Sequence, residues 1–494
     1  MSLAQPLVLY IPLIKGADMR YLSVVMAAAC TVAVTQVALA ADMPVKAPVI
    51  AAPAWSWTGF YVGVNAGGSI GRDPTTQSIS NGIQTPTVGS FTMSPAGFIG
   101  GGQIGYNYQF APHWVIGVEG DFQGASQKDS SCILDCVGIV SSFTVNDTQK
   151  IKWFATARAR FGYTGSPYLL YVTGGAAWAQ VHNDLTVFIN NIDAAGSANF
   201  NRSGWTIGGG IETHLGGNWS AKLEYLYLDF GSITDVAFQD GLTFTSKSDI
   251  RDHIVRVGLN YKVADAGASA YRAPPAPASV WNWTGFYVGL NAGGSIGRDP
   301  TTQSVSNAFA NATFGSFTMS PAGFIGGGQI GYNYQFAPHW VVGVEGDFQG
   351  ASQSDSSCVG RCGGTSGVTS FTVTDTQKLK WLATARARLG YTGSPFLWYV
   401  TGGAAWARVH NDLLVILPQQ IFPGSADFNQ SGWTIGGGVE THLGSNWTGK
   451  LEYLYVDLGS LTDIAISTNP DRTWTSHSNI RDHIVRVGVN YKFN

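Results

Sequence analysis

Four charged residues lie in the middle of segments that otherwise alternate between apolar and polar side chains: Glu119, Arg158, Glu224 and Arg256. Two carboxylates could act as a general acid and a general base, but such a site also needs a nucleophile and a group that orients the base. The sequence supplies no such set near these residues. Each carboxylate has instead a guanidinium at a similar depth, so we expect Arg158 to pair with Glu119 and Arg256 with Glu224, in a structural network without enzymatic activity.

Other charged residues share the same faces as these four, and the second half of the chain repeats the set. Glycines on those faces, Gly101, Gly105, Gly208 and Gly210, would leave room for long side chains. The predicted network comprises Glu119, Asp121, Arg158, Arg160, Lys222, Glu224, Arg256, Glu345, Asp347, Arg386, Arg388, Lys450, Glu452 and Arg486.

Two further patterns could suggest a ligand site. Gly100-x-Gly102-x-x-Gly105 matches the dinucleotide-binding fingerprint, but that fingerprint requires a loop that opens a helix, and the residues after it continue to alternate as a strand. The histidines are scattered over segment ends and are not spaced as metal ligands. We therefore expect neither a cofactor nor a bound metal ion.

Four of the five cysteines form two C-x-x-x-C pairs, Cys132 with Cys136 and Cys358 with Cys362. Both pairs lie in polar segments rich in Ser and Gly, without the second pair or the histidines that a zinc site needs. An exported protein meets an oxidising compartment, so we expect each pair to form a local disulfide. Paired free thiols are the alternative.

The segment 150–164, KIKWFATARARFGYT, shows how the arginines are placed. With a period of two, one face is apolar, begins with Ile151 and carries aromatic residues toward both ends, while the other face carries Lys150, Lys152 and both arginines. A soluble sheet could show this pattern. Aromatic ends around an apolar middle favour a strand with lipid on one side and a polar lumen on the other.

Eight such segments occur in the first half of the chain, and their connections alternate between short and long. Ala111-Pro112 and Gly216-Gly217 are tight turns, whereas the connections near 70–96, 127–149, 183–203 and 232–250 are long and polar. This alternation is typical of an all-β, up-and-down antiparallel transmembrane β-barrel with its short turns in the periplasm. The segments lie near Trp57 to Ser69, Gly97 to Phe110, His113 to Ser126, Lys150 to Thr164, Tyr168 to His182, Gly204 to Leu215, Asn218 to Gly231 and Arg251 to Val263.

The chain is a tandem duplication, because Trp57 to Tyr61, WTGFY, recurs at Trp283 to Tyr287 and the cysteine pairs recur with it. An Ala/Pro-rich stretch separates the copies and is typical of an extended linker. It is far longer than the short turns, which favours two eight-stranded barrels over one barrel of sixteen strands. The expected organisation is a signal peptide at 1–40, a periplasmic Ala/Pro-rich segment at 41–54, a first barrel at 55–263, a linker at 264–280 and a second barrel at 281–494.

The N-terminal region and the composition agree with export to a membrane. From Met19, an arginine, an apolar core and Ala38-Leu39-Ala40 form a cleavable signal pattern, with a single anchoring helix as the alternative. Charged residues make up 12% of the chain and the net charge is −3, so nothing attracts a nucleic acid. Beyond this region no apolar run is long enough to cross a membrane as a helix.

Taken together, the motifs WTGFYVGVNAGG, GGQIGYNYQF, GVEGDF, ARARFGY, GGAAW, KLEYLYLDFG and HIVRVGLNYKV resemble the outer membrane immunogenic proteins of α-proteobacteria, a porin-like family related to opacity-type surface antigens. The resemblance covers nearly all of both copies. It implies an eight-stranded barrel in the outer membrane of a Gram-negative bacterium, a cleaved signal, and a role in envelope integrity, surface exposure or small-solute passage. It implies no catalytic residues.

Two features depart from that family. Its members usually contain one barrel, and they end on an aromatic residue that the barrel-insertion machinery recognises. Here Gly488, Tyr491 and Phe493 fit that signal, but Asn494 follows them. We expect the second copy to carry the recognised signal, because the first copy ends on Val263.

The sequence thus predicts a structural surface protein of the outer membrane, in contact with its lipids, with a lumen plugged by the charge network. Porin-like passage of small solutes, through two narrow barrels or one sixteen-stranded pore, is the main alternative. Binding or adhesion through the long loops is a third possibility, and the sequence does not identify an extracellular ligand.

Overall fold

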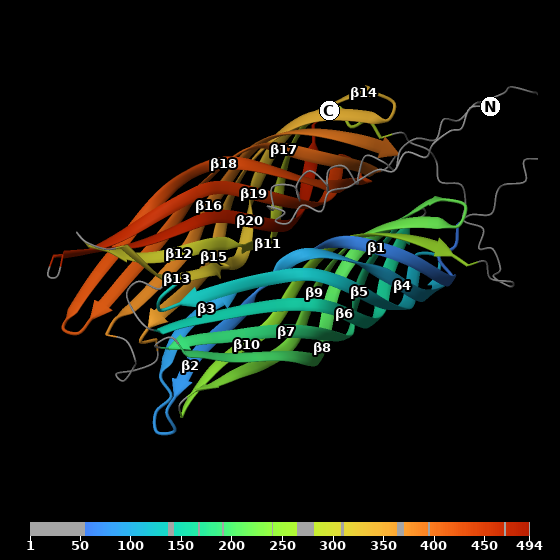
Figure 1. Ribbon diagram of the computed structural model, residues 1–494. Helices are drawn as coiled ribbons and strands as arrows, with labels where there is room; N and C mark the ends of the chain where they lie inside the picture. Colours follow the sequence, from blue (N-terminus) through green and yellow to red (C-terminus); the bar gives the residue numbers. More distant parts are fainter. Residues whose placement is uncertain are drawn as a thin grey trace, which may run out of the picture. The chain divides into compact units, whose positions relative to one another are not determined.

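The computed structural model describes residues 55–136, 143–165, 168–189, 192–239, 241–263, 281–307, 311–362, 370–393, 396–468 and 471–493. These residues form antiparallel β-strands (Figure 1). Among them, no helix is long and apolar enough to cross a membrane. The first copy contains β1 (Gly59–Gly71), β2 (Asp73–Ser80), β3 (Thr87–Met93), β4 (Ala96–Ala111), β5 (Trp114–Ile133), β6 (Phe143–Gly165), β7 (Tyr168–Ile189), β8 (Ile192–Gly216), β9 (Trp219–Gln239) and β10 (Leu242–Lys262).

The second copy repeats this order with nearly the same lengths. It contains β11 (Gly285–Gly297), β12 (Asp299–Ser306), β13 (Asn311–Met319), β14 (Ala322–Ala337), β15 (Trp340–Gly360), β16 (Thr372–Gly393), β17 (Phe396–Leu417), β18 (Gln420–Gly444), β19 (Trp447–Thr468) and β20 (Asp471–Lys492).

Strand pairing closes a ring within each copy. In the first, β4 to β10 pair consecutively and β1 pairs with both β4 and β10. In the second, β11 pairs with β14 and β20 in the same way. The hairpin β2–β3 extends the first ring beside β10. Further pairings of β13 with β5 and of β15 with β3 place all the strands in one sheet, so the division into two separate barrels stays a prediction.

The turns at one end are tight because their sequences favour it. Ala111 pairs with Trp114 across a two-residue turn that contains Pro112. Gly217 has a φ of 56°, in the left-handed region that glycine adopts without steric cost, and it reverses the chain between β8 and β9.

An apolar band with aromatic borders covers the outward face of the strands. Near the tight turns, Trp114 on β5 stacks against Phe161 on β6, with ring centroids 5.0 Å apart. Farther along the same strands, Phe122 stacks against Trp153 at 5.5 Å. The stretch from Trp114 to Phe122 contains nine residues, and a membrane-crossing β-strand needs about 9–11. We call the second border, formed by Phe122, Trp153, Trp178, Trp205 and Tyr227, the outer aromatic ring.

The predicted lengths of the long connections are wrong, because most of the residues assigned to them belong to strands. β6 begins at Phe143 and β7 ends at Ile189, and the two pair along this entire length. Beyond the outer aromatic ring the outward face becomes mostly polar, while inward residues such as Val145 and Val187 pack into an apolar core. Side chains therefore still alternate between the two faces, but here the inward face is partly apolar and the outward face mostly polar. For this reason the sequence pattern of a membrane-crossing strand does not extend to these residues.

A β-bulge corrects a second prediction. The pairing register shifts between Ile151 and Trp153 on β6, opposite a shift between Gly124 and Gln127 on β5. The inserted residue moves the preceding side chains to the opposite face. Ile151 is consequently buried inside the ring, whereas Lys150 and Lys152 point outward rather than into the lumen.

Candidate functional site: a charge network in the lumen

Arg158 occupies the centre of the lumen of the first copy and contacts three carboxylates. Its Nη2 forms a close ion pair with Glu119 and lies 2.9 Å from Oδ2 of Asp121, while its Nη1 lies 2.9 Å from Oε1 of Glu224. The Thr156 hydroxyl accepts a hydrogen bond from its Nε at 2.9 Å. Three strands, β5, β6 and β9, supply these groups, so the contacts cross the lumen as well as joining neighbours.

Two more cations complete the central contacts. Arg256 on β10 lies 2.6 Å from Glu224 and 2.9 Å from Asp121. Lys222 donates to Glu119 at 2.7 Å. Glu119 faces Arg158 across one strand pair, and Arg256 faces Glu224 across another, as the sequence suggested. Each carboxylate is thus shared between cations, which lowers the cost of burying it.

Glu212 on β8 belongs to the same network, although the sequence analysis missed it. Arg160 donates to Oε2 of Glu212 at 2.8 Å, and Asn260 and Ser220 donate to its other oxygen at 2.8 Å and 2.6 Å. Glu212 lies directly across from Lys222 in the pairing of β8 with β9, and this register is the signal that could have identified it.

Two tyrosines connect the network to the wall of the ring. The Tyr61 hydroxyl donates to Glu119 at 2.8 Å, and the Tyr171 hydroxyl donates to Glu224 at 3.0 Å. A Cβ at Gly105 would lie 2.3 Å from the Tyr61 hydroxyl, and one at Gly210 would lie 2.8 Å from that of Tyr171. These glycines therefore make room for tyrosines.

The other two glycines expected to make room have different neighbours. A Cβ at Gly101 would lie closest to the carbonyl oxygen of Phe122, and one at Gly208 would lie closest to that of Tyr225. At both positions the absent side chain lets the backbone of the adjacent strand approach closely.

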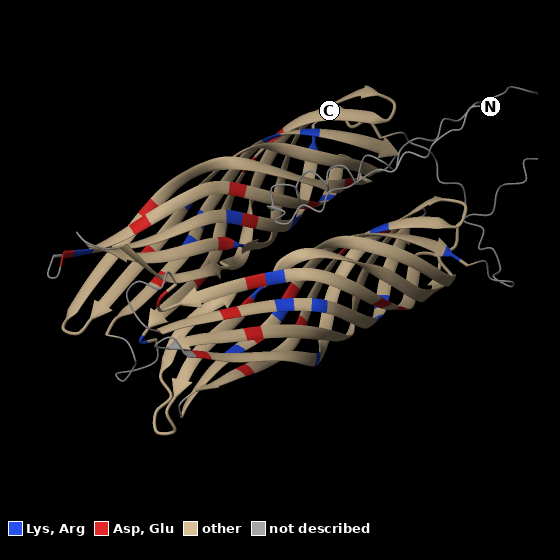
Figure 2. Cartoon of the chain, viewed as in Figure 1, with Lys and Arg blue, Asp and Glu red and all other residues tan. Residues whose placement is uncertain are grey.

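The second copy holds the same arrangement. Arg386 pairs with Glu345, with Asp347 at 2.9 Å and with Glu452 at 2.9 Å. The remaining members of the predicted network also take the corresponding positions, with Glu440 in the place of Glu212: Arg388 contacts Glu440, Lys450 contacts Glu345, and Arg486 contacts Asp347 and Glu452. Figure 2 shows the charged positions along the strands.

Apolar side chains fill the lumen on both sides of this layer. Toward the tight turns, Trp57 packs with Val115, Leu169 and Tyr171, and its indole N–H donates to Thr164 at 2.8 Å. Toward the other end, a cluster that includes Phe154 and Phe230 covers the charges. The eight charged side chains that form this network in the first copy are at most 2% exposed. The arrangement is thus shielded from solvent, although Nε of Arg160 and Nη1 of Arg256 are buried without a hydrogen-bond partner among the described residues.

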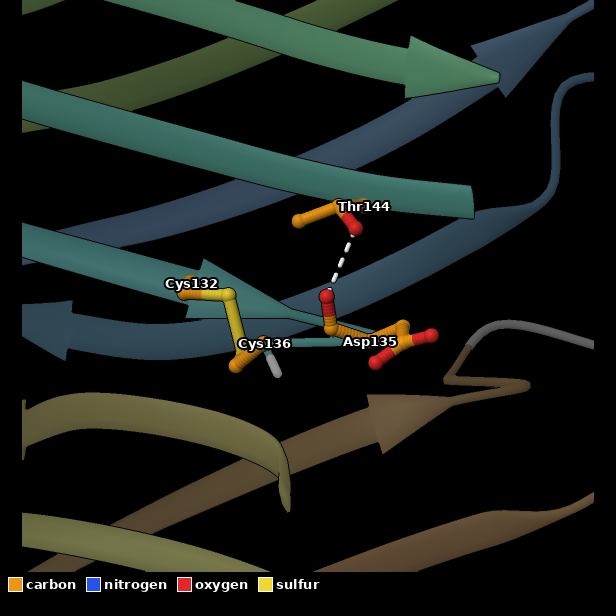
Figure 3. Close-up of a disulfide and its surroundings, with 4 residues drawn as sticks. All are labelled: Cys132, Asp135, Cys136 and Thr144. Atoms are coloured by element: carbon orange, nitrogen blue, oxygen red, sulfur yellow. Dashed lines mark hydrogen bonds between the residues drawn. A yellow bond between two sulfur atoms is a disulfide. The ribbon is translucent and has the colours of Figure 1, made fainter. Parts of the chain in front are cut away.

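The cysteine pairs lie at the far ends of β5 and β15, well beyond the outer aromatic ring. Disulfides join Cys132 to Cys136 and Cys358 to Cys362. Figure 3 shows the first of them, beside which the Thr144 hydroxyl donates to the Asp135 carbonyl at 2.6 Å.

The remaining predicted features are only partly described by the structure. Tyr491 and Phe493 lie on the outward face near the tight-turn end, with ring centroids 5.4 Å apart, and Gly488 faces the lumen beside Lys450. The signal peptide, the Ala/Pro-rich segments at 41–54 and 264–280, and Asn494 lie outside the described residues. Within the described ranges, no three His, Cys, Asp or Glu side chains form a group that could hold a metal ion.

Sequence comparison decides the family. A family model described as an outer membrane protein beta-barrel domain matches residues 26–262 and again residues 266–493. The chain belongs to the outer membrane β-barrel proteins. The predicted all-β barrel fold and the outer membrane location are thereby confirmed, and two successive matches confirm the duplication.

Relatives of this family agree with the predicted resemblance. The 31 kDa outer-membrane immunogenic protein of Brucella melitensis is 38% identical over 235 residues, which are 47% of this chain and 92% of the relative. The 22 kDa outer membrane protein of Rhizobium leguminosarum bv. viciae is 32% identical over 45% of this chain and 83% of its own. A nearly complete relative thus matches about half of the chain.

Among solved structures, Neisserial surface protein A is similar over 42% of this chain and 98% of its own, with 13% identity and a TM-score of 0.21. That similarity is too low to support an argument about function.

Proposed function

We propose that the protein is a structural surface protein of the outer membrane, with the lumen of each copy plugged and without catalytic activity. One observation supports this above all others: four cations and four carboxylates per copy contact one another inside the ring and are shielded from solvent. An acid–base catalyst needs a group that can reach a substrate, and a conducting pore needs a hydrated path. Neither requirement agrees with this packing.

The proposed orientation places the tight turns in the periplasm and the long strand extensions outside the cell. Outer membrane barrels have short periplasmic turns and longer extracellular connections. The extensions beyond the outer aromatic ring present mostly polar side chains outward, as a surface in water should, with exposed apolar exceptions such as Phe238.

Planar-bilayer conductance tests the plug. Purified protein should show no large, stable channel currents, and a heat-dependent gel shift of the same sample should show that the barrels are folded. Large and stable channels from folded protein would contradict the proposal and would favour the alternative, passage of small solutes through two narrow barrels or one wider pore.

We also propose that Gly488, Tyr491 and Phe493 form the signal for the barrel-insertion machinery. Tyr491 and Phe493 are 36% and 49% exposed, so both rings are accessible. The double change Tyr491→Ala with Phe493→Ala should lower the amount of protein in the outer membrane fraction. The corresponding change at Tyr261 and Val263 of the first copy should not, and equal losses would contradict the assignment.

A further inference from the structure

The β-bulge on β6 places two lysines on the outward surface directly beyond the outer aromatic ring. Trp153 belongs to that ring, and Lys152 is its neighbour on the side away from the tight turns. Lys152 is exposed, and the Lys150 side chain is 38% exposed. Without the register shift both ammonium groups would point into the lumen.

Neighbouring strands contribute polar groups that hold these lysines against the sheet. Lys152 donates to Oδ1 of Asn199 on β8 at 2.8 Å, and Lys150 lies 3.3 Å from Asp184 on β7. The Ser197 hydroxyl donates to the same aspartate at 2.8 Å. The lysines therefore have a defined position across three strands.

This surface carries an excess of positive charge. Lys128 on β5 is also exposed and points outward two positions beyond Ser126. Among the described residues, neither Lys128 nor Lys152 has a carboxylate within 4.0 Å, whereas Lys150 has Asp184. By contrast, Arg251 on β10 lies between two carboxylates, at 3.5 Å and 3.6 Å. Among the described residues, the three lysines on β5 and β6 thus have one carboxylate, that of Asp184, within 4.0 Å.

The second copy has the same arrangement of a β-bulge and two outward-facing lysines. A register shift between Leu379 and Trp381 turns Lys378 and Lys380 outward beside Trp381, which stacks on Phe348. Lys378 lies 3.4 Å from Asp412, a carboxylate whose pKa is lowered by a hydrogen bond from Ser425. Lys380 has no carboxylate within 4.0 Å among the described residues.

We propose that Lys128, Lys150 and Lys152, and in the second copy Lys378 and Lys380, form a surface that binds the phosphate groups of phosphorylated glycolipid headgroups in the outer leaflet. The outer aromatic ring marks the interface between the hydrocarbon and the headgroups, because amphipathic rings collect at that level. Lysine side chains just beyond such a ring extend their ammonium groups into the headgroup layer. The assignment to the outer leaflet rests on the orientation proposed above.

Binding by the full mature protein in detergent tests the site independently of orientation and of the plug. The probes are a diphosphorylated glucosamine disaccharide lipid, the same lipid without its phosphates, and phosphatidylglycerol, each measured by native mass spectrometry. The diphosphorylated lipid should bind at least about tenfold more tightly than either of the others, and rising NaCl concentration should weaken its binding. Equal binding of the dephosphorylated lipid would overturn the phosphate site, and equal binding of phosphatidylglycerol would overturn the preference for glycolipid headgroups.

A site variant and a control variant locate the site. The variant Lys150→Gln, Lys152→Gln, Lys378→Gln, Lys380→Gln should lose about fivefold in affinity for each lysine removed. Lys247→Gln with Arg472→Gln removes basic residues near the far strand ends and should leave binding unchanged. Unchanged binding by the fourfold variant would overturn the proposal. If that variant failed to fold, as judged by its heat-dependent gel shift, the salt and phosphate dependence of the unmodified protein would still decide.

Discussion

At the scale of single residues, the contribution of Arg158 to stability depends on how many carboxylates it neutralises. It contacts Glu119, Asp121 and Glu224, and its side chain is 1% exposed. Removing one partner of a buried ion pair is far more destabilising than removing a surface pair, because the remaining charge cannot be solvated. The network is thus expected to contribute strongly to stability.

Arg158→Ala combined with Arg386→Ala should therefore destabilise each copy by about 3–5 kcal/mol. The measurement is the urea concentration at which the heat-dependent gel shift is lost. Arg408→Ala is the control, because that arginine pairs with Asp427 on the exposed surface and its loss should leave the midpoint unchanged. Equal midpoints for the lumen variant and the unmodified protein would contradict a structural role for the network.

Gly105 tests whether the lumen is packed. A Cβ there would lie 2.3 Å from the Tyr61 hydroxyl, and Gly331 has the same relation to its own tyrosine. Gly105→Ala with Gly331→Ala should cost about 1–3 kcal/mol per copy through overpacking. Gly68→Ala with Gly294→Ala should be tolerated, because no heavy atom lies within 4 Å of the position that the added methyl group would take at either glycine. A lumen wide enough to conduct would tolerate both pairs equally.

At the scale of strands, the sequence allowed the membrane-crossing parts to be predicted because an apolar outward face and a polar inward face alternate there without interruption. Val115 and Glu119 face inward, and Trp114 and Val118 face outward. Beyond the outer aromatic ring both faces contain polar residues, so the signal weakens and the strand extensions resemble loops. The bulge before Trp153 could not be predicted, because it depends on the register with β5.

The strand ends also carry the cysteine pairs, which a mass measurement can test. Cys132 and Cys136 are joined at the end of β5, as are Cys358 and Cys362 at the end of β15. Alkylation of the denatured, unreduced protein should add no mass, whereas reduction should expose four thiols. Mass addition without reduction would show that these pairs remain as free thiols.

At the scale of the whole molecule, the two copies differ in where a protease could cut them from outside. Arg361 follows the end of β15, and Arg472 lies at the start of β20, so the second copy has trypsin sites near its far strand ends. The first copy has Asp135 and Leu242 near the corresponding ends. The predicted periplasmic linker contains Arg272.

Trypsin added to intact cells should therefore cut after Arg361 and Arg472 and should leave Arg272 intact. Once the outer membrane is permeabilised, cleavage at Arg272 should divide the chain into two fragments. Each fragment should keep its own heat-dependent gel shift if each copy closes its own barrel, because no lumen contact would be lost. Cleavage at Arg272 in intact cells would reverse the topology, and loss of the gel shift in both fragments after the cut would favour one sixteen-stranded barrel.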